Sequence, residues 1–223
     1  MALNIAMDGP VGAGKSTIAD EVARRLNILH LDTGAMYRAV GLTALKRGLD
    51  VTDEEAVTRL CESLTVDVAH GATGQRTLVN GEDVTDGLRT EEVSMAASKV
   101  ATYGGVRRAM VAAQQRMARQ TDMLLDGRDI GTRVLPEATV KIFLTADAEE
   151  RARRRFEQLK EKGVAADFDE VLADLRRRDE QDSRRAIDPL RAAEDAVIVD
   201  STNLTFEQTV ETIVRLAKER AHG

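Results

Sequence analysis

The nine residues from Gly9 to Thr17 constrain this chain more than any other segment. They match the pattern G-x-x-x-x-G-K-[ST] in full, as Gly9, Pro10, Val11, Gly12, Ala13, Gly14, Lys15, Ser16 and Thr17. The glycines let backbone N–H groups surround phosphate oxygens, and a following helix N-terminus adds partial positive charge. The motif predicts a phosphate-binding loop in which Lys15 reaches the β- and γ-phosphates of a nucleotide and the Ser16 hydroxyl binds Mg²⁺.

The surroundings of the motif have the alternation expected of a parallel sheet. An apolar strand candidate at 3–7 precedes the loop, and 15–26 has the pattern of a helix. Further strand candidates alternate with helix-length segments and lie at 28–31, 123–125, 140–144 and 196–199. Helix boundaries are indicated by capping boxes and C-terminal glycines, at 52–55, 147–150, 205–208, Gly48 and Gly163. The pattern predicts an α/β fold with a parallel sheet core flanked by helices.

Residues 64–84 interrupt this alternation. Short extended pieces are expected at 64–68, 77–79 and 82–84, and Asn80-Gly81 separates the last two. Asn-Gly between extended segments favours a two-residue hairpin, because both central residues need positive φ. We therefore expect a small antiparallel insert. It could serve the substrate site or dock another protein.

Composition excludes several function classes. A net charge of −6 and only 3% aromatic residues argue against binding nucleic acid, whereas ten of the 25 arginines fall between 151 and 191 and suggest handling of small anions. No apolar run approaches the ~20 residues of a membrane span, and the motif begins too early to leave room for a signal peptide. The lone cysteine, Cys61, is expected to be buried and fits a cytoplasmic protein.

Asp126 is the candidate second metal ligand. It follows the apolar residues 123–125, where proteins with this loop place a carboxylate facing the metal, although it could instead cap the following turn. The chain has no Asn-Lys-x-Asp element for guanine and is too short for a large mechanical ATPase. With the late arginines, these features favour phosphoryl transfer to a small acceptor.

Over essentially its whole length the chain resembles the bacterial cytidylate kinases of the nucleoside-monophosphate kinase family. The resemblance rests on 9–17, 31–38 (LDTGAMYR), 126–132 (DGRDIGT), 140–144 (VKIFL), 178–185 (RDEQDSRR) and 200–202 (DST). It implies one P-loop kinase domain, with its core at 1–32, 104–150 and 167–223, a monophosphate-binding region containing the insert at 33–103, and a lid at 151–166. It also implies a monomer that transfers the γ-phosphoryl group of ATP to CMP or dCMP with Mg²⁺.

The resemblance further assigns roles by position. It implies an acceptor site in which Thr33 and Arg38 contact the nucleotide. The phosphate of the nucleotide is expected on Arg38, Arg128 and Arg185, and its ribose beside Arg178 and Asp182. Its cytosine ring is expected among Ser98, Arg107 and Asp129. Lid arginines, among them Arg151 and Arg154, are expected to close over the transferring group. The catalytic set is then Lys15, Arg128, Arg154 and Arg185. Family members often carry Ser at the position of Thr33, which keeps the hydroxyl.

Structural alternatives stay open at several of these positions. Arg38 could be a solvated helix arginine, Arg178 and Asp182 could pair with each other at i,i+4, and Asp129 could pair with Arg128. Arg185 is expected one turn beyond Asp182, on a helix that ends at Asp188-Pro189. Kinases acting on UMP, AMP or shikimate, and a nucleotide-binding module without turnover, are the functional alternatives. No general base is expected, because an acceptor phosphate is already largely ionised.

Overall fold

The computed structural model describes residues 3–71 and 74–221, and these fall into two compact units. Unit 1 is formed by residues 3–28 and the chain from Leu124 onward, and unit 2 by residues 29–123. Six residues of the predicted segments lie outside the described ones. They are 1–2 in the expected core at 1–32, 72–73 in the expected region at 33–103, and 222–223 in the expected core at 167–223. The finer division into core, monophosphate-binding region and lid stays a prediction.

The main sheet confirms the predicted α/β fold. Its five strands follow the order β2-β6-β1-β7-β8, and β1 pairs parallel with β7, as β7 does with β8. The strands are β1 (Asn4–Asp8), β2 (Leu29–Asp32), β6 (Met123–Gly127), β7 (Val140–Thr145) and β8 (Val197–Asp200). The helical segments of unit 1 are α1 (Lys15–Leu26), the short turn η2 (Ile130–Val134), α6 (Ala148–Glu161), α7 (Phe168–Ser183) and α8 (Phe206–Ala221).

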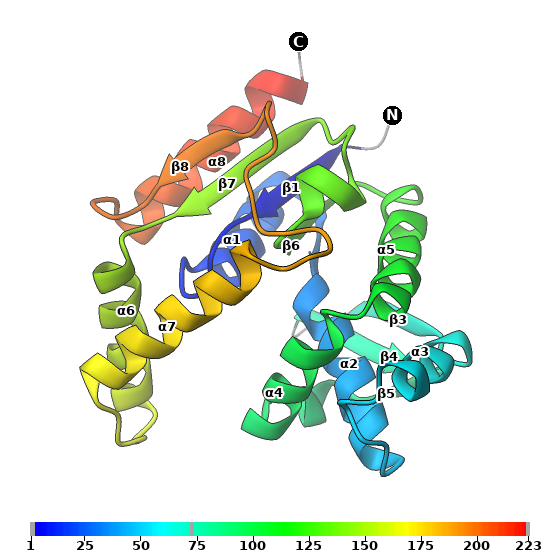
Figure 1. Cartoon of the computed structure of the whole chain (residues 1–223). Coiled ribbons are helices and arrows are strands. Elements are labelled where there is room, and N and C mark those ends of the chain that lie inside the picture. Colours follow the sequence, from blue (N-terminus) through cyan, green and yellow to red (C-terminus); the bar gives the residue numbers. More distant parts are fainter. Residues whose placement is uncertain (1–2, 72–73, 222–223) are drawn as a thin grey trace. The chain divides into compact units, whose positions relative to one another are not determined.

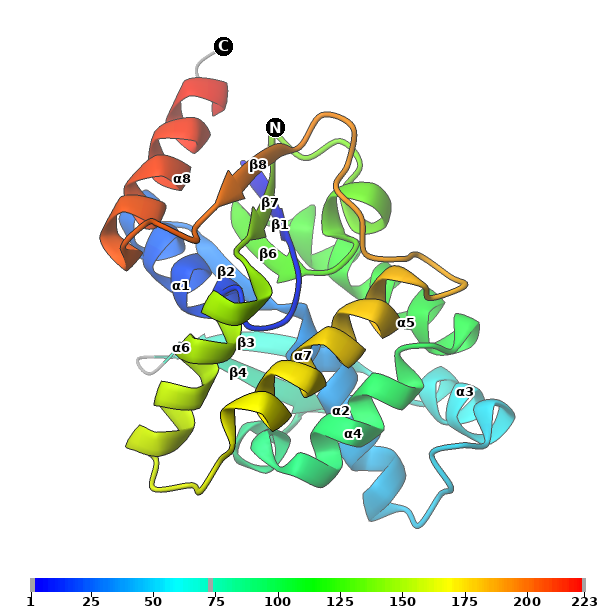
Figure 2. The same cartoon turned by 60° about the vertical axis from the view of Figure 1, so that its left-hand side comes forward.

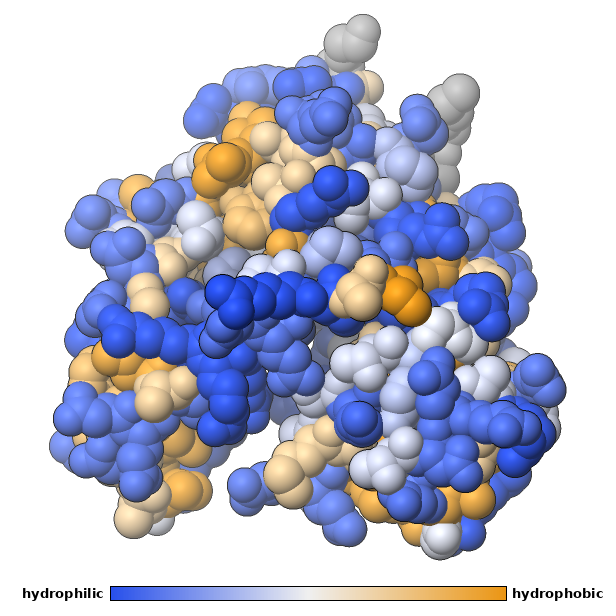
Figure 3. Space-filling model, in the orientation of Figure 1, coloured by the Kyte–Doolittle hydropathy of each residue, from blue (hydrophilic) through white to orange (hydrophobic). Residues whose placement is uncertain are grey.

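The core of unit 1 lies between the sheet and two helices. Alternate residues of β7 point to one face, and Ile142 and Leu144 are at most 1% exposed there. Figures 1 and 2 show α1 and α8 side by side, and their apolar residues, such as Val22 and Ile213, complete this core. Each such side chain stabilises the fold by about 1.5–3 kcal/mol. Figure 3 shows hydrophobic surface over β7 and β8, where Ile198 of edge strand β8 is 64% exposed.

Unit 2 contains the predicted antiparallel insert. Strands β3 (Val66–Gly71), β4 (Gly74–Val79) and β5 (Glu82–Asp83) form a three-stranded sheet in that order. Asn80 and Gly81 have φ values of 51° and 84°, which confirms the predicted turn. The helical segments of unit 2 are α2 (Thr33–Lys46), α3 (Glu54–Glu62), η1 (Thr85–Arg89), α4 (Glu91–Val100) and α5 (Gly104–Ala118).

Helix boundaries are confirmed in part. Thr205 and Gln208 form a reciprocal capping box, in which each side chain accepts from the other residue's backbone N–H. The expected box at 52–55 is wrong, because Asp53 caps α3 while the Thr52 hydroxyl donates to Asp50. The expected box at 147–150 is also wrong: the Asp147 side chain makes no capping bond, and the Glu150 carboxylate accepts from Arg153 and Arg154.

The end of α7 differs from the expectation. The helix ends at Ser183 rather than at Asp188-Pro189. The Ser183 hydroxyl donates to the carbonyl of Asp179 at 2.7 Å, and the Leu190 N–H donates to the carbonyl of Asp182 at 2.9 Å. The second bond turns the chain back toward the helix end, so Arg185 belongs to a loop rather than to the helix.

Cys61 is buried on α3 as expected, with 4% exposure, and burial raises the pKa of its thiol to about 11. Within residues 3–71 and 74–221, no helix combines the length and the apolar character that crossing a membrane requires.

Candidate functional site

The phosphate-binding loop joins β1 to α1 and is shaped by its glycines. Gly9 cannot be replaced without moving backbone, because an added Cβ would lie 2.0 Å from the carbonyl oxygen of Leu144. Gly14 caps α1 with a φ of 81°, a left-handed conformation that favours glycine. The loop is therefore held against β7, with the N-terminus of α1 directly behind it.

Lys15 is folded back onto its own loop. Its ammonium donates to the carbonyls of Gly9 and Pro10 at 2.7 and 2.8 Å, and the residue is 7% exposed. Burial, assisted by the nearby charge of Arg128, lowers the pKa of Lys15 to about 7. A phosphate in the loop would give this ammonium an anionic partner in place of neutral carbonyls.

Ser16 and Asp126 come together at the edge of the sheet. The Ser16 hydroxyl donates to Oδ2 of Asp126 at 2.7 Å, and Asp126 is 3% exposed at the end of β6. Among the residues that the structure describes, this site included, no group of three or more His, Cys, Asp or Glu side chains could hold a metal ion. A hydroxyl and one carboxylate suit Mg²⁺, which takes few protein ligands and completes its shell with water and phosphate oxygens.

Asp8 is a functional candidate that the sequence reasoning missed. It is 3% exposed and accepts from the backbone N–H groups of Ile130 and Gly131 at 2.7 and 2.8 Å. Burial raises the pKa of its carboxyl to about 6. Asp8 thus holds the turn that presents Arg128 and Asp129 next to the loop. An acidic residue that ends a buried strand directly before Gly9 was the available signal.

Four predicted acceptor residues meet in one arginine–carboxylate cluster, formed by Arg128, Asp129, Asp182 and Arg185. Nε of Arg128 donates to Oδ2 of Asp182 at 2.6 Å. Nη2 of Arg185 lies 3.7 Å from Oδ1 of Asp129, and both side chains are 8% exposed. Arg185 is also held by the carbonyls of Ile187 and Asp188.

The cluster corrects two alternatives drawn from the sequence. Arg178 does not pair with Asp182, because its Nε lies 3.0 Å from Asp174 on the preceding turn. Arg128 pairs with Asp182 rather than with Asp129. Arg178 therefore stands apart from the cluster, and its expected role at the ribose stays a prediction.

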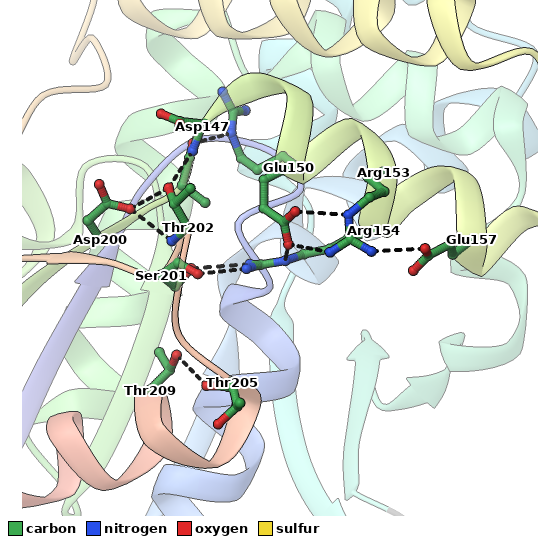
Figure 4. A network of polar contacts seen from close by, with 12 residues as sticks. Asp147, Glu150, Arg153, Arg154, Glu157, Asp200, Ser201, Thr202, Thr205 and Thr209 are labelled. Carbon is green, nitrogen blue, oxygen red and sulfur yellow. Dashed lines mark hydrogen bonds and ion pairs between the residues drawn. The ribbon is translucent and has the colours of Figure 1, made fainter.

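The two predicted lid arginines are bound to the body of unit 1. Arg151 is 5% exposed and donates to the carbonyls of Ala146 and Val11 at 2.9 and 2.8 Å, and to Asp179 at 2.7 Å. It ties the phosphate-binding loop to α6 and α7. Figure 4 shows Arg154 between Glu150 and Ser201, whose carbonyl it meets at 2.7 Å. A role of Arg154 in catalysis stays a prediction.

The remaining candidates lie in unit 2. Asp32 caps α2 by accepting from the N–H of Ala35, and this places Thr33, 4% exposed, at the helix start as expected. Nη1 of Arg38 lies 3.5 Å from Oδ2 of Asp32, and the arginine side chain is 36% exposed. Arg107 of α5 is 2% exposed, with its guanidinium 5.9 Å from the ring centre of Tyr37. Ser98 is exposed on α4.

Comparison with known proteins gives a consistent result. The family model described as cytidylate kinase matches residues 5–219. A cytidylate kinase of Shouchella clausii is 48% identical over 218 residues, covering 98% of this chain and 97% of that protein. One of Pseudomonas aeruginosa is 49% identical over 213 residues, covering 95% and 93%. A solved gluconokinase from Sinorhizobium meliloti covers 100% of this chain and 96% of that one at 13% identity and a TM-score of 0.50, which shows a shared fold.

Proposed function

This chain belongs to the cytidylate kinase family, and we propose that it transfers the γ-phosphoryl group of ATP to CMP or dCMP, giving CDP or dCDP and ADP. The observation that carries this proposal is the similarity to curated cytidylate kinases over nearly the whole chain. The complete phosphate-binding loop supports it, because Lys15 and the loop glycines are all present and folded as such a loop requires.

Catalysis in this proposal consists of positioning and charge neutralisation. Lys15 exchanges its carbonyl partners for oxygens of the transferring phosphate. The acceptor is a phosphate that is largely ionised near neutral pH, so no side chain has to remove a proton from it. Arg128 and Arg185 grip two oxygens each through their planar guanidinium groups, which stay charged throughout.

Mg²⁺ belongs to the same proposal. Ser16 and Asp126 would hold it, because their oxygens already meet at 2.7 Å at the foot of the loop. Bound there, the ion would neutralise charge on the phosphate oxygens during transfer. The contribution of the chain is to supply one carboxylate and one hydroxyl on rigid elements, the end of β6 and the start of α1.

The arginine–carboxylate cluster suits an acceptor that carries both a phosphate and a polar base. Its guanidinium groups would turn from carboxylates to phosphate oxygens. The carboxylates would then accept from neutral donors, Asp182 from a ribose hydroxyl and Asp129 from the exocyclic amino group of cytosine. The short Arg128–Asp182 contact and the near burial of the Arg185–Asp129 pair support this role, because they bring two guanidinium groups and two carboxylates together in one place.

A coupled assay of ADP release with CMP, dCMP, UMP, AMP and shikimate, run side by side, tests the proposal. We expect kcat/KM to be highest with CMP or dCMP. A preference for AMP, UMP or shikimate would show that the proposed acceptor is wrong, although the protein would still be a kinase. Nucleotide binding without ADP release from any acceptor would instead indicate a binding module without turnover.

A further inference from the structure

The β3–β4 hairpin of the insert approaches strand β2 inside unit 2 through two side chains. β2 is an edge strand of the main sheet, and edge strands leave backbone groups that need partners. His70 and Gln75 lie directly opposite each other in the β3–β4 register, so their side chains share one face of the hairpin. That face is turned toward β2.

Both side chains bond to the backbone of β2. A ring nitrogen of His70, Nε2, lies 2.7 Å from the carbonyl oxygen of His30. Oε1 of Gln75 accepts from the N–H of Asp32 at 2.8 Å, and Nε2 of Gln75 donates to the carbonyl of Asp32 at 3.3 Å. Gln75 therefore meets both backbone groups of one residue, as a paired strand would.

Asp32 is the residue on which the start of α2 depends. Its Oδ1 accepts from the N–H of Ala35 at 3.2 Å and thereby caps the helix. Its Oδ2 lies 3.5 Å from Nη1 of Arg38. A shift of the Asp32 backbone would displace the helix cap, and with it Thr33 and the guanidinium of Arg38.

We propose that Gln75 is a positioning residue for the acceptor nucleotide, which holds Asp32 so that Thr33 and Arg38 stand ready to bind it. This inference rests on the proposed function and on the acceptor roles of Thr33 and Arg38. It assigns the hairpin to the substrate site rather than to the docking of another protein.

Gln75→Met tests the proposal, with Arg76→Met as its matched control. Methionine keeps the length of the side chain and removes both hydrogen bonds to Asp32, together with a 3.5 Å bond to the Thr77 hydroxyl. Arg76 is the next residue of β4, is exposed and pairs with Asp83, so its side chain serves β5 rather than β2. The measurements are kcat, the KM values for CMP and ATP, and the hydrogen-exchange rate of the Asp32 amide.

We expect Gln75→Met to raise the KM for CMP about fivefold, which corresponds to one lost hydrogen bond. The kcat and the KM for ATP should stay within about twofold of wild type, and the Asp32 amide should exchange faster. Arg76→Met should change none of these values. Gln75→Asn keeps the amide but is too short to reach Asp32, so it should reproduce the effect if Gln75→Met folds poorly.

An unchanged KM for CMP in both Gln75 variants, or an equal rise in Arg76→Met, would overturn the positioning role alone. A wild-type protein without ADP release in the presence of CMP would overturn the proposed function and this inference with it. A lower kcat together with equal rises in the KM values for CMP and ATP would mark Gln75 as a general stabiliser of the fold. That result would likewise overturn the proposal.

Discussion

The phosphate-binding loop and the arginine–carboxylate cluster both belong to unit 1, but they are built in opposite ways. The loop is one run of consecutive residues, and its shape comes from backbone, as the 2.0 Å distance from a Gly9 Cβ to Leu144 shows. The cluster is made of side chains from separate segments: the turn after β6, the last turn of α7 and the loop that follows it. Its charges are paired with each other.

The loop and the cluster differ in the contacts that must break before a phosphate can bind. In the loop, the amides and Lys15 are in place, and only the Lys15 ammonium must exchange two carbonyls for phosphate oxygens. In the cluster, each arginine must leave or share a carboxylate before it can hold a phosphate. We therefore expect substitutions in the loop to lower the rate of transfer most, and those in the cluster to affect both rate and acceptor choice.

Lys15→Ala should have the largest effect. We expect kcat to fall by about 10²–10³-fold or more while the fold stays intact, because the chain loses the only side-chain cation of the loop. Steady-state kinetics and circular dichroism measure the two quantities. Lys218→Ala, an exposed lysine on α8, is the control. Activity within a few-fold of wild type would remove Lys15 from the catalytic set.

Arg185→Lys should be next, with a loss of kcat of about tenfold or more. Lysine keeps the charge and loses the fork that grips two oxygens. Arg184→Lys is a close control, because Arg184 is the preceding residue, pairs with Glu180 and has a side chain that is 79% exposed. If both variants behave alike, the two-pronged guanidinium of Arg185 contributes nothing to transfer.

Asp129→Asn should alter acceptor choice more than rate. A carboxylate accepts from the amino group of cytosine and repels the carbonyl that uracil presents there, whereas an amide can turn to donate. We expect the CMP-to-UMP ratio of kcat/KM to fall about fivefold, within the ~1–3 kcal/mol range of one unpaired polar group. The ratio is measured for wild type and variant in the same assay. An unchanged ratio would show that Asp129 only holds Arg185.

The smallest expected effect is an uptake of protons by Lys15 when ATP binds. Because the pKa of Lys15 is about 7 without ligand, the side chain is mostly neutral at pH 8. Phosphate oxygens favour its charged form, so ATP binding at pH 8 should take up a fraction of one proton. Calorimetry in buffers of different ionisation enthalpy measures this uptake, and Lys15→Met should abolish it.

The same shift of the Lys15 pKa has a consequence for stability. The unfolded chain, with Lys15 at its ordinary value of 10.5, binds the proton more tightly than the folded chain. The free energy of unfolding should therefore rise between about pH 7 and 10.5, and this contribution should be missing in Lys15→Met. Proton uptake equal in both proteins, or the same pH dependence of unfolding, would contradict the lowered pKa.

What the sequence predicted well depends on local patterns. The loop, the strands of the main sheet and the Asn80-Gly81 turn follow from neighbouring residues, because glycine conformation and alternating burial act over short distances. Spacing alone left a pairing of Arg178 with Asp182 open, and the structure pairs Asp182 with Arg128 instead, which lies 54 positions away in the sequence. Asp8 and Gln75 were missed for the same reason. Their partners, Ile130 and Asp32, are distant in the sequence.

Because Cys61 is buried, its rate of alkylation reports local unfolding of the segment around α3. A thiol with a pKa of about 11 and 4% exposure reacts slowly with alkylating reagents at neutral pH, since the thiolate is the nucleophile and access is blocked. Each labelling event must then follow a local unfolding of unit 2 around α3. With a single cysteine in the sequence, the rate of mass increase counts those openings without any engineered probe. A surface cysteine added elsewhere would label first, so the two signals can be read separately in time.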